Sequence, residues 1–185
     1  MDASTVHEFM NPPPTLHLIS GLPGSGKTTY AEGLRADSGA GLFSLDRWLV
    51  TAYGRYFLAE VGHEEHTRRV LACRELMWAS ASELLQRRTD AILDDGFFLR
   101  EHRRRYVEMA SALGVRTTIH YVHASLDVIR RRLERRNQHL PPHNFYIDPQ
   151  VLVGFVGLYE VPSAEEGAAI VSVDTSKDRP RHDAH

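Results

Sequence analysis

The stretch TLHLISGLPGSGKTTY, residues 15–30, places a short apolar run before a glycine-rich turn, a lysine and two threonines. Residues 21–28 match the phosphate-loop pattern G-x-x-x-x-G-K-[ST] without a mismatch. The glycines let backbone N–H groups turn inward around an anion, in conformations that a side chain would oppose. The helix that follows would direct its positive end at the same place. The stretch therefore predicts a strand, a phosphate-binding loop and a helix, in that order.

The side chains of this loop predict a nucleoside triphosphate site. Lys27, one of two lysines in the chain, supplies a cation for the β- and γ-phosphates, and the Thr28 hydroxyl is placed to bind Mg²⁺. The other lysine, Lys177, lies in TSKDR and does not form the N/T-K-x-D motif of guanine-specific sites, so we expect ATP. The predicted nucleotide-binding residues are Gly21, Leu22, Pro23, Gly24, Ser25, Gly26, Lys27, Thr28 and Thr29.

Length and composition suit one domain around one core, with 185 residues of which 42% are hydrophobic and 25% charged. We expect this domain to span residues 15–174, between a flexible N-terminal segment, 1–14, and a flexible tail, 175–185. No apolar run approaches the ~18 residues of a membrane span, and the first residues lack the basic start of a secretory signal. Because the single Cys73 cannot form an internal disulfide, we expect a cytoplasmic location.

Apolar periodicity along the chain alternates between strand and helix patterns. The predicted strands are 16–20, 41–44, 91–93, 115–122 and 168–173, and the predicted helices are 28–36, 64–88, 100–113, 125–136 and one that begins with Asp148 as cap and Pro149 at its first position. Such alternation predicts an α/β fold with a parallel sheet and helices on both faces. Ligands of such sheets bind beyond the carboxyl ends of the strands.

Two acidic positions at these strand ends are candidates for phosphoryl transfer. Asp46, in LFSLDRWL, is expected at the end of the second strand, where it could act as general base or could cap the helix that follows. The third strand runs into AILDDG, and an apolar run ending in Asp is the pattern that positions Mg²⁺. We take Asp94 as the magnesium residue, with Asp95 on the opposite side of the strand as the alternative.

A basic segment follows the fourth strand. In DVIRRRLERRN, Arg132 and Arg136 are four residues apart and share one helix face, where they could stabilise the charge of a phosphoryl group in transfer. A solvated basic helix is the competing interpretation. With the proline-containing segment that follows, residues 130–147 are predicted to form a lid that excludes water.

The clusters of aromatic and histidine residues support weaker predictions about function. Some of the aromatic residues after the two acidic positions could line an acceptor pocket, although most aromatic side chains belong to cores. They are Trp48, Tyr53, Tyr56, Phe57, Phe97 and Phe98. The histidines of HEEH and HYVH lack the i, i+4 spacing of a zinc helix, and no cysteine accompanies them, so we predict no zinc site.

The segments LISGLPGSGKTTYA, FSLDRW, ILDDGFFLREHR and RRLERRN together resemble small bacterial P-loop kinases related to chloramphenicol phosphotransferase, zeta toxins and the kinase domain of polynucleotide kinase. The resemblance covers about residues 15–160. It implies ATP- and Mg²⁺-dependent phosphorylation of a hydroxyl on a five-stranded parallel sheet of order 2-3-1-4-5. It also implies that Asp46 is the general base, that Asp94 is the Walker B acid, and that Arg132 and Arg136 are lid arginines. Leu45 and Asp95 depart from the family pattern, which often has proline and an apolar or small residue there.

These features together predict an ATP-dependent phosphotransferase that moves the γ-phosphoryl group to a hydroxyl of a small molecule. A polynucleotide 5′-hydroxyl kinase is an alternative, but the near balance of 22 basic and 24 acidic residues disfavours a nucleic-acid partner. A non-catalytic ATP-binding regulatory protein is the second alternative. No membrane partner is expected, and the pattern indicates no oligomeric state.

Overall fold

The computed structural model describes residues 12–177, so that most of the predicted N-terminal segment and most of the predicted tail lie outside the described residues. The strands are β1 (Thr15–Ser20), β2 (Gly41–Ser44), β3 (Ala91–Gly96), β4 (Arg116–His123) and β5 (Ala169–Asp174). The α-helices are α2 (Lys27–Ser38), α3 (Leu45–Tyr53), α4 (Leu58–Gln86), α5 (Arg100–Ala112), α6 (Leu126–Gln138) and α7 (Leu152–Leu158). Two short 3₁₀ helices are η1 (Pro149–Val151) and η2 (Ala164–Glu166). No helix within residues 12–177 is long and apolar enough to cross a membrane.

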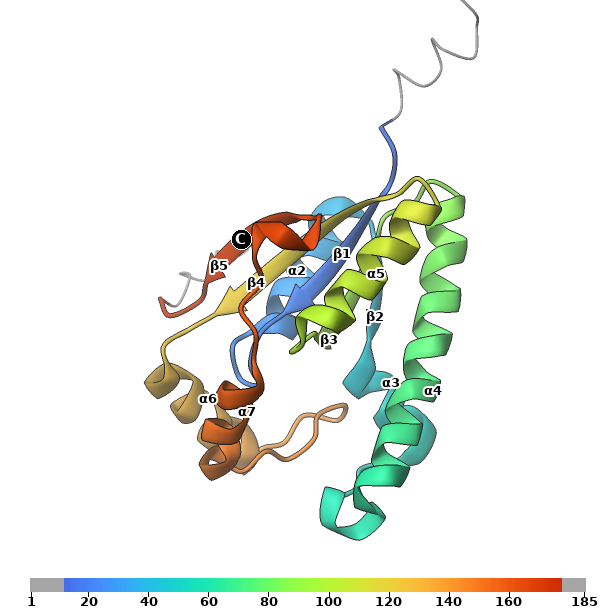
Figure 1. The fold of residues 1–185 in the computed structure, drawn as a ribbon. Helices are drawn as coiled ribbons and strands as arrows, with labels where there is room; N and C mark the ends of the chain where they lie inside the picture. Colours follow the sequence, from blue (N-terminus) through green and yellow to red (C-terminus); the bar gives the residue numbers. More distant parts are fainter. Residues whose placement is uncertain (1–11, 178–185) are drawn as a thin grey trace, which may run out of the picture.

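The five strands form one parallel sheet in the order β2-β3-β1-β4-β5, as predicted. β1 lies at the centre between β3 and β4, so the loop that follows it opens in the middle of the carboxyl edge of the sheet. This is the position where parallel α/β sheets bind their ligands. Helices cover both faces, with α5 in front of the sheet and α2 behind it in Figure 1.

Alternate residues of the strands form the cores of the two faces. Leu18 of β1 and Leu93 of β3 belong to the larger core, which includes the buried face of α4 and residues of α5. Ile19 and Ile92, their neighbours in sequence, face the smaller core beneath α2. Cys73 of α4 is 3% exposed within the larger core.

Two groups of helices extend beyond the carboxyl edge of the sheet (Figure 1). One group is α6 and α7, whose residues Ile129, Leu133 and Leu152 form a small core of their own. The other group is α3 with the first half of α4. The segment 139–148, here called the lid loop, connects α6 to η1 and extends toward α3 and α4.

Several predictions about the elements differ from the structure. The helix predicted from Pro149 begins as the 3₁₀ helix η1 and continues as α7 from Leu152. The third strand continues through Asp94 and Asp95 to Gly96, because both carboxylates have partners inside the fold. The helix predicted from residue 64 begins at Leu58, with a kink at Gly62, where φ is 80°. The prediction that Asp46 ends the second strand is wrong: Ser44 is already the N-cap of α3, and Asp46 lies in the first turn of that helix.

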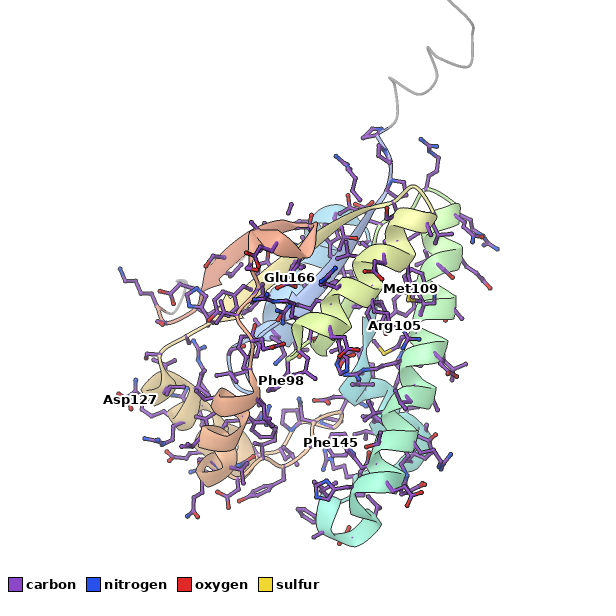
Figure 2. All side chains as sticks on the ribbon, in the orientation of Figure 1. Phe98, Arg105, Met109, Asp127, Phe145 and Glu166 are labelled. Carbon is purple, nitrogen blue, oxygen red and sulfur yellow. The ribbon has the colours of Figure 1, made fainter. Side chains whose placement is uncertain are left out.

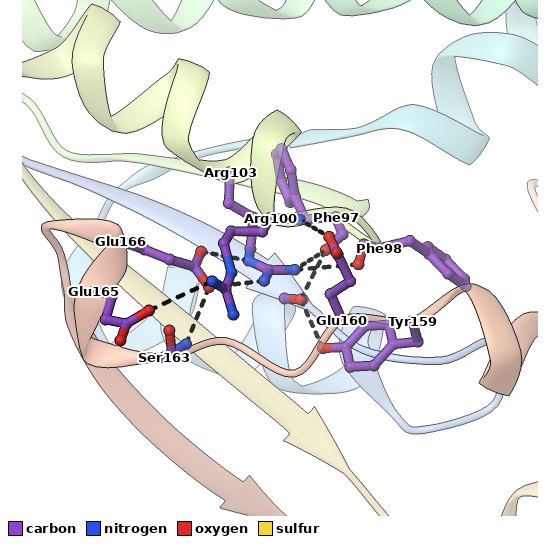
Figure 3. A network of polar contacts seen from close by, with 10 residues as sticks. Phe97, Phe98, Arg100, Arg103, Tyr159, Glu160, Ser163, Glu165 and Glu166 are labelled. Carbon is purple, nitrogen blue, oxygen red and sulfur yellow. Dashed lines mark hydrogen bonds and ion pairs between the residues drawn. The ribbon is translucent and has the colours of Figure 1, made fainter.

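The segment 159–166, here called the strap, joins α7 to β5 and is fastened to the sheet by a polar network (Figure 3). Arg103 of α5 and Glu166 form a bidentate ion pair, with N···O distances of 2.7 and 2.8 Å, and both side chains are completely buried. The Tyr159 hydroxyl lies 2.7 Å from the Oγ of Ser20, the last residue of β1. The strap therefore connects the end of α7 to the strand that carries the glycine-rich loop.

Candidate active site

The glycine-rich loop between β1 and α2 has a geometry that only glycine permits at its first position. Gly21 donates its N–H to the carbonyl of Gly96 at 3.0 Å, which ties the loop to the end of β3. A Cβ on Gly21 would lie 2.1 Å from the carbonyl oxygen of Val122. Gly24 and Gly26 have φ values of 79° and 94°, in the left-handed region that favours glycine.

The loop presents unused hydrogen-bond donors at the start of α2. Within the described chain, the backbone N–H groups of residues 26–29 have no acceptor, and the Oγ of Ser25 is buried without a partner. Converging N–H groups at a helix N-terminus are a binding site for an anion such as a phosphate. The loop is thus shaped for the phosphates of a nucleotide.

Lys27 extends over this loop. Its Nζ donates to the carbonyl of Leu22 at 3.0 Å. Burial lowers the pKa of Lys27, while the carboxylates of Asp94 and Asp46 oppose that shift. Lys27 therefore lies close to both candidate acids. A cation that contacts both a triphosphate and the group that reacts with it would occupy such a position.

Thr28 and Asp94 form a pair beside the loop. The Thr28 hydroxyl donates to Oδ2 of Asp94 at 2.8 Å. Burial raises the pKa of Asp94, and Lys27 counteracts that shift. No group of three or more His, Cys, Asp or Glu residues within residues 12–177 could hold a metal ion. The pair nevertheless fits Mg²⁺, because this ion takes one or two protein oxygens together with phosphates and water.

Asp95 faces the other side of β3 and has a different partner. Arg74 of α4 donates from Nε and Nη2 to its two carboxylate oxygens, at 2.6 and 2.8 Å, and the Asp95 side chain is 1% exposed. The structure thus brings Asp94, and not Asp95, to the threonine of the loop. Sequence reasoning did not identify Arg74, because the periodicity of a long helix does not reveal which of its polar residues meets the end of a strand.

Asp46, in the first turn of α3, is the second acid near Lys27. Its carboxylate accepts no hydrogen bond from the described residues, so it is not the cap of α3. Burial raises the pKa of Asp46 to about 6, with Lys27 lowering it and Asp94 raising it. A carboxylate with this pKa is mostly ionised at neutral pH and holds a proton firmly enough to act as a base.

The two arginines predicted on one helix face have different neighbours. Arg132 donates from Nη1 to Oγ1 of Thr175 at 3.0 Å and from Nη2 to its carbonyl at 2.6 Å. Thr175 Oγ1 in turn donates to the carbonyl of Ser25 at 2.7 Å, so Arg132 lies at the outer side of the loop. Arg136 donates to the carbonyl of Phe145 at 3.3 Å, keeps a buried Nε without a partner, and has Asp46 as a charged neighbour.

The aromatic residues divide between core and site. Phe97 is 1% exposed in the larger core, and Trp48 packs against that core. Tyr56 instead contacts Phe145 of the lid loop, with ring centroids 5.1 Å apart, and Asp46 is among the groups that affect its pKa. Figure 2 shows Phe145 on the lid loop. Of the predicted aromatic residues, Tyr56 is thus one that contacts the lid loop, with the charge of Asp46 acting on its hydroxyl.

Comparisons with known proteins fit this geometry. Residues 16–152 match the model of a protein family described as an AAA domain. A search of the curated proteins found no match. The fold is similar to that of a protein from Chloroflexus aurantiacus J-10-fl to which a kinase activity is attributed, with a TM-score of 0.70 and 21% identity over 89% of this chain and 90% of that one.

Two further solved structures have the same fold. Kti12 from Chaetomium thermophilum, in complex with ADP-AlF3, has a TM-score of 0.63 and 21% identity over 88% of this chain and 89% of that one. A gluconokinase from Sinorhizobium meliloti 1021 has a TM-score of 0.58 and 18% identity over 90% of this chain and 85% of that one. At these identities the likeness establishes a kinase-like P-loop fold.

Proposed function

The chain belongs to the AAA-domain family, and from that premise we propose that it is an ATP- and Mg²⁺-dependent kinase that phosphorylates a hydroxyl of a small molecule. One observation carries the proposal. Asp46 is half-buried near Lys27, and its carboxylate accepts no hydrogen bond from the described residues, so it is free to accept a proton from a substrate. A protein that only binds ATP has no need for such a group.

The loop residues would hold the triphosphate. In this proposal the N–H groups of residues 26–29 and Lys27 bind the phosphate oxygens, and Thr28 and Asp94 hold Mg²⁺. Mg²⁺, when bound, would neutralise charge on the β- and γ-phosphates. Arg136, with its buried Nε and a place near Asp46, is the lid residue we assign to the transferring group. Arg132 supports the loop through Thr175.

Asp46 would then act on the acceptor. Its carboxylate removes the proton of the acceptor hydroxyl as the oxygen forms a bond to the γ-phosphorus. The bond between that phosphorus and the bridging oxygen breaks, and ADP leaves with the electron pair. Two structural neighbours support a small hydroxylated acceptor as the substrate class. They are the gluconokinase and the Chloroflexus aurantiacus protein to which a kinase activity is attributed.

The test is transfer of labelled phosphate from ATP to a panel of small hydroxylated compounds and a 5′-hydroxyl oligonucleotide. Asp46→Asn should lower the transfer rate roughly 10²–10⁴-fold, because the amide cannot accept the proton. It should leave the Kd for ATP nearly unchanged, since Asp46 forms no hydrogen bond or ion pair with the loop within the described residues. Asp37→Asn is the matched control, because Asp37 is exposed at the far end of α2.

Four outcomes would contradict the proposal. Phosphoryl transfer by the Asp46→Asn variant at the wild-type rate would show that Asp46 is not the general base. Transfer to the oligonucleotide alone would indicate a polynucleotide kinase. ATP binding without transfer to any compound would indicate a regulatory protein. Unchanged ATP affinity in Lys27→Ala would argue against the nucleotide site itself.

A further inference from the structure

Resting on the proposed kinase function, we infer that the acceptor carries a carboxylate or a phosphate besides its reacting hydroxyl, and that Arg69 of α4 binds this anion. The Arg69 side chain is 18% exposed, and its Nε donates to Glu65 at 2.7 Å. Among the described residues, its Nη1 and Nη2 have no hydrogen-bond partner. A half-buried guanidinium with unused donors favours an anion as its ligand, because the pairing offsets the water that burial has removed.

The contacts of α4 define where Arg69 lies. Arg74 of this helix meets Asp95 at the end of β3, so Arg74 is level with the carboxyl edge of the sheet. Arg69 precedes it by about 7.5 Å of helix, in the half of α4 that extends beyond the sheet (Figure 1). Cys73, one turn after Arg69, is buried in the larger core, so Arg69 continues the inner face of the helix. Arg69 therefore borders the space beyond the strand ends, where parallel sheets bind their ligands.

Two aromatic rings hold the Arg69 guanidinium in place. It lies over the rings of Tyr53 and Tyr56, at 4.8 and 4.7 Å from their centroids. The Tyr56 ring also packs against Phe145 of the lid loop, with ring centroids 5.1 Å apart. These contacts use none of the Nη donors, so the cation is positioned before a ligand binds.

The carboxylate beside Arg69 does not balance the arginines around it. Arg68 binds both oxygens of Glu65, at 2.6 and 2.7 Å, and Arg69 shares one of them. One carboxylate thus serves two guanidinium groups and leaves one positive charge in excess. Because the Arg68 side chain is 63% exposed, water screens its charge, whereas the less exposed Arg69 keeps more of its attraction for an anion.

Two further arginines on this side form no ion pair among the described residues. Arg136 of α6 donates to the carbonyl of Phe145 at 3.3 Å, and Arg55 donates to two carbonyls of the lid loop. Positive charge therefore lies on both sides of the contact between Tyr56 and Phe145, with Arg69 on one side and Arg136 on the other. Such an excess of one sign attracts a small molecule of the opposite charge.

Helix α3 connects Arg69 to the candidate base. Asp46 and Tyr53 are seven residues apart in this helix, within about 20° of two full turns, so they share one of its faces. Their Cα atoms are about 10 Å apart along the helix axis. The Arg69 guanidinium lies over Tyr53, at the outer end of this face. A molecule of the size of a sugar acid or a sugar phosphate can span such a distance, with a hydroxyl at Asp46 and its anion at Arg69.

Matched acceptors on the wild-type protein test the substrate class. Neutral sugars and polyols are each grouped with the corresponding sugar acid and sugar phosphate, and transfer from labelled ATP is measured for every member. We expect kcat/KM to be about tenfold higher or more for an anionic member, because hydrogen bonds to charged groups are the stronger ones. Whether the acid or the phosphate reacts faster identifies the anion. An equal or higher kcat/KM for the neutral members would overturn the inference and leave the kinase function intact, whereas no transfer to any member would overturn both.

Arg69→Gln tests the assigned residue, because it removes the charge and keeps a polar side chain beside the two tyrosines. The KM for the anionic acceptor should rise about 10–100-fold, the effect of losing a hydrogen bond to a charged group. The kcat and the KM for ATP should change less than about twofold, since only acceptor binding is lost. Arg68→Gln, at the exposed neighbour that shares Glu65, is the matched control and should keep the acceptor KM within about threefold of the wild type. An unchanged acceptor KM in Arg69→Gln, or an equal rise in both variants, would contradict the assignment.

Glu65→Gln covers the case in which Arg69→Gln does not fold, and it should act in the opposite direction. It removes the charge that partly balances Arg69 and keeps an oxygen that can accept the hydrogen bond from Nε. The KM for the anionic acceptor should fall about two- to fivefold, while the KM for a neutral acceptor stays the same. A KM for the anionic acceptor that stays the same or rises would show that Arg69 does not bind the anion.

Discussion

At the scale of single residues, Asp46 should give the reaction its pH dependence. Its pKa is raised to about 6 by burial, and only the ionised form can take the acceptor proton. The transfer rate should therefore be constant above about pH 7 and fall about tenfold per pH unit below pH 6. The measurement is kcat/KM for the acceptor between pH 5 and pH 8. A profile that stays flat down to pH 5 would contradict the role of this carboxylate.

Gly21 and Gly33 offer a matched pair of glycine substitutions. Gly21→Ala would place its Cβ 2.1 Å from the carbonyl oxygen of Val122, a backbone atom that cannot move without disturbing β4. We expect it to destabilise the protein by about 1–3 kcal/mol or more. A Cβ on Gly33, inside α2, meets nothing within 4 Å, so Gly33→Ala should stabilise by about 0.5–1 kcal/mol. Urea unfolding measures both, and equal effects would refute the steric argument.

Sequence reasoning at this scale predicts the arrangement of residues best where one local pattern fixes their spacing. The glycines, Lys27 and Thr28 form one continuous motif, so their mutual arrangement follows from their spacing. Arg74 could not be found in this way, because its partner Asp95 is 21 residues away, on another element. Asp46 was found as a candidate base, but its place inside α3 was not, since a four-residue strand leaves little periodicity to mark its end.

At the scale of elements, a chain of polar side chains, of which His120 is buried and the others half-buried, joins α2, β4 and β1. The Tyr30 hydroxyl lies 2.8 Å from Nδ1 of His120, whose Nε2 lies 2.9 Å from Nδ1 of His17. Asp90 follows at 3.7 Å from the Nε2 of His17. Each neutral imidazole can serve as both donor and acceptor, so the contacts among Tyr30, His120 and His17 form with both histidines neutral, while Nε2 of His17 has no hydrogen-bond partner among the described residues.

These histidines should make stability depend on pH. Burial lowers the pKa of His120 to about 4, below its ordinary value of 6.5. The unfolded chain therefore binds this proton at a higher pH than the folded one, and stability is lost as pH falls from about 6.5 to 4. The loss from this residue is about 2–3 kcal/mol. Unfolding by urea across this range should show it, and His120→Asn should flatten the slope.

His143→Asn, at an exposed position of the lid loop, is the control for that measurement and should keep the wild-type slope. An identical slope in His120→Asn would show that the buried histidines do not set the pH dependence.

Element types were predictable and some element ends were not. The parallel sheet and its order follow from the alternation and from the resemblance, and the structure agrees. The start of α4 at Leu58 was missed because Gly62 interrupts the helical pattern, and the structure accommodates it as a kink. The continuation of β3 through two acids was missed because their buried partners come from distant elements.

At the scale of the whole molecule, the lid and the opposite helices are in contact across the site. Arg55, between α3 and α4, donates to the carbonyls of Leu140 and Pro141 in the lid loop, at 3.4 and 2.6 Å. The ring of Tyr56 packs on Phe145 in the same loop. A ligand that moves one side must therefore move or break these contacts, so in the proposed kinase acceptor binding would be linked to the position of the lid loop.

The strap that follows α7 is held to the sheet by the buried ion pair between Arg103 and Glu166. Glu166→Gln would leave the Arg103 charge without its partner in a completely buried place, which costs about 3–5 kcal/mol. Glu165→Gln is the control, since its side chain is 82% exposed and 3.4 Å from Arg100, and should cost under about 1 kcal/mol. Both variants are compared with the wild type by urea unfolding at pH 7.

The same substitution should also affect the glycine-rich loop. Arg103 donates to the carbonyl of Phe97, which also accepts from the Ser20 hydroxyl, so the loss of order should extend to the start of that loop. Glu166→Gln should therefore also weaken ATP binding, and two variants of equal stability would mean that the strap does not hold the lid to the sheet.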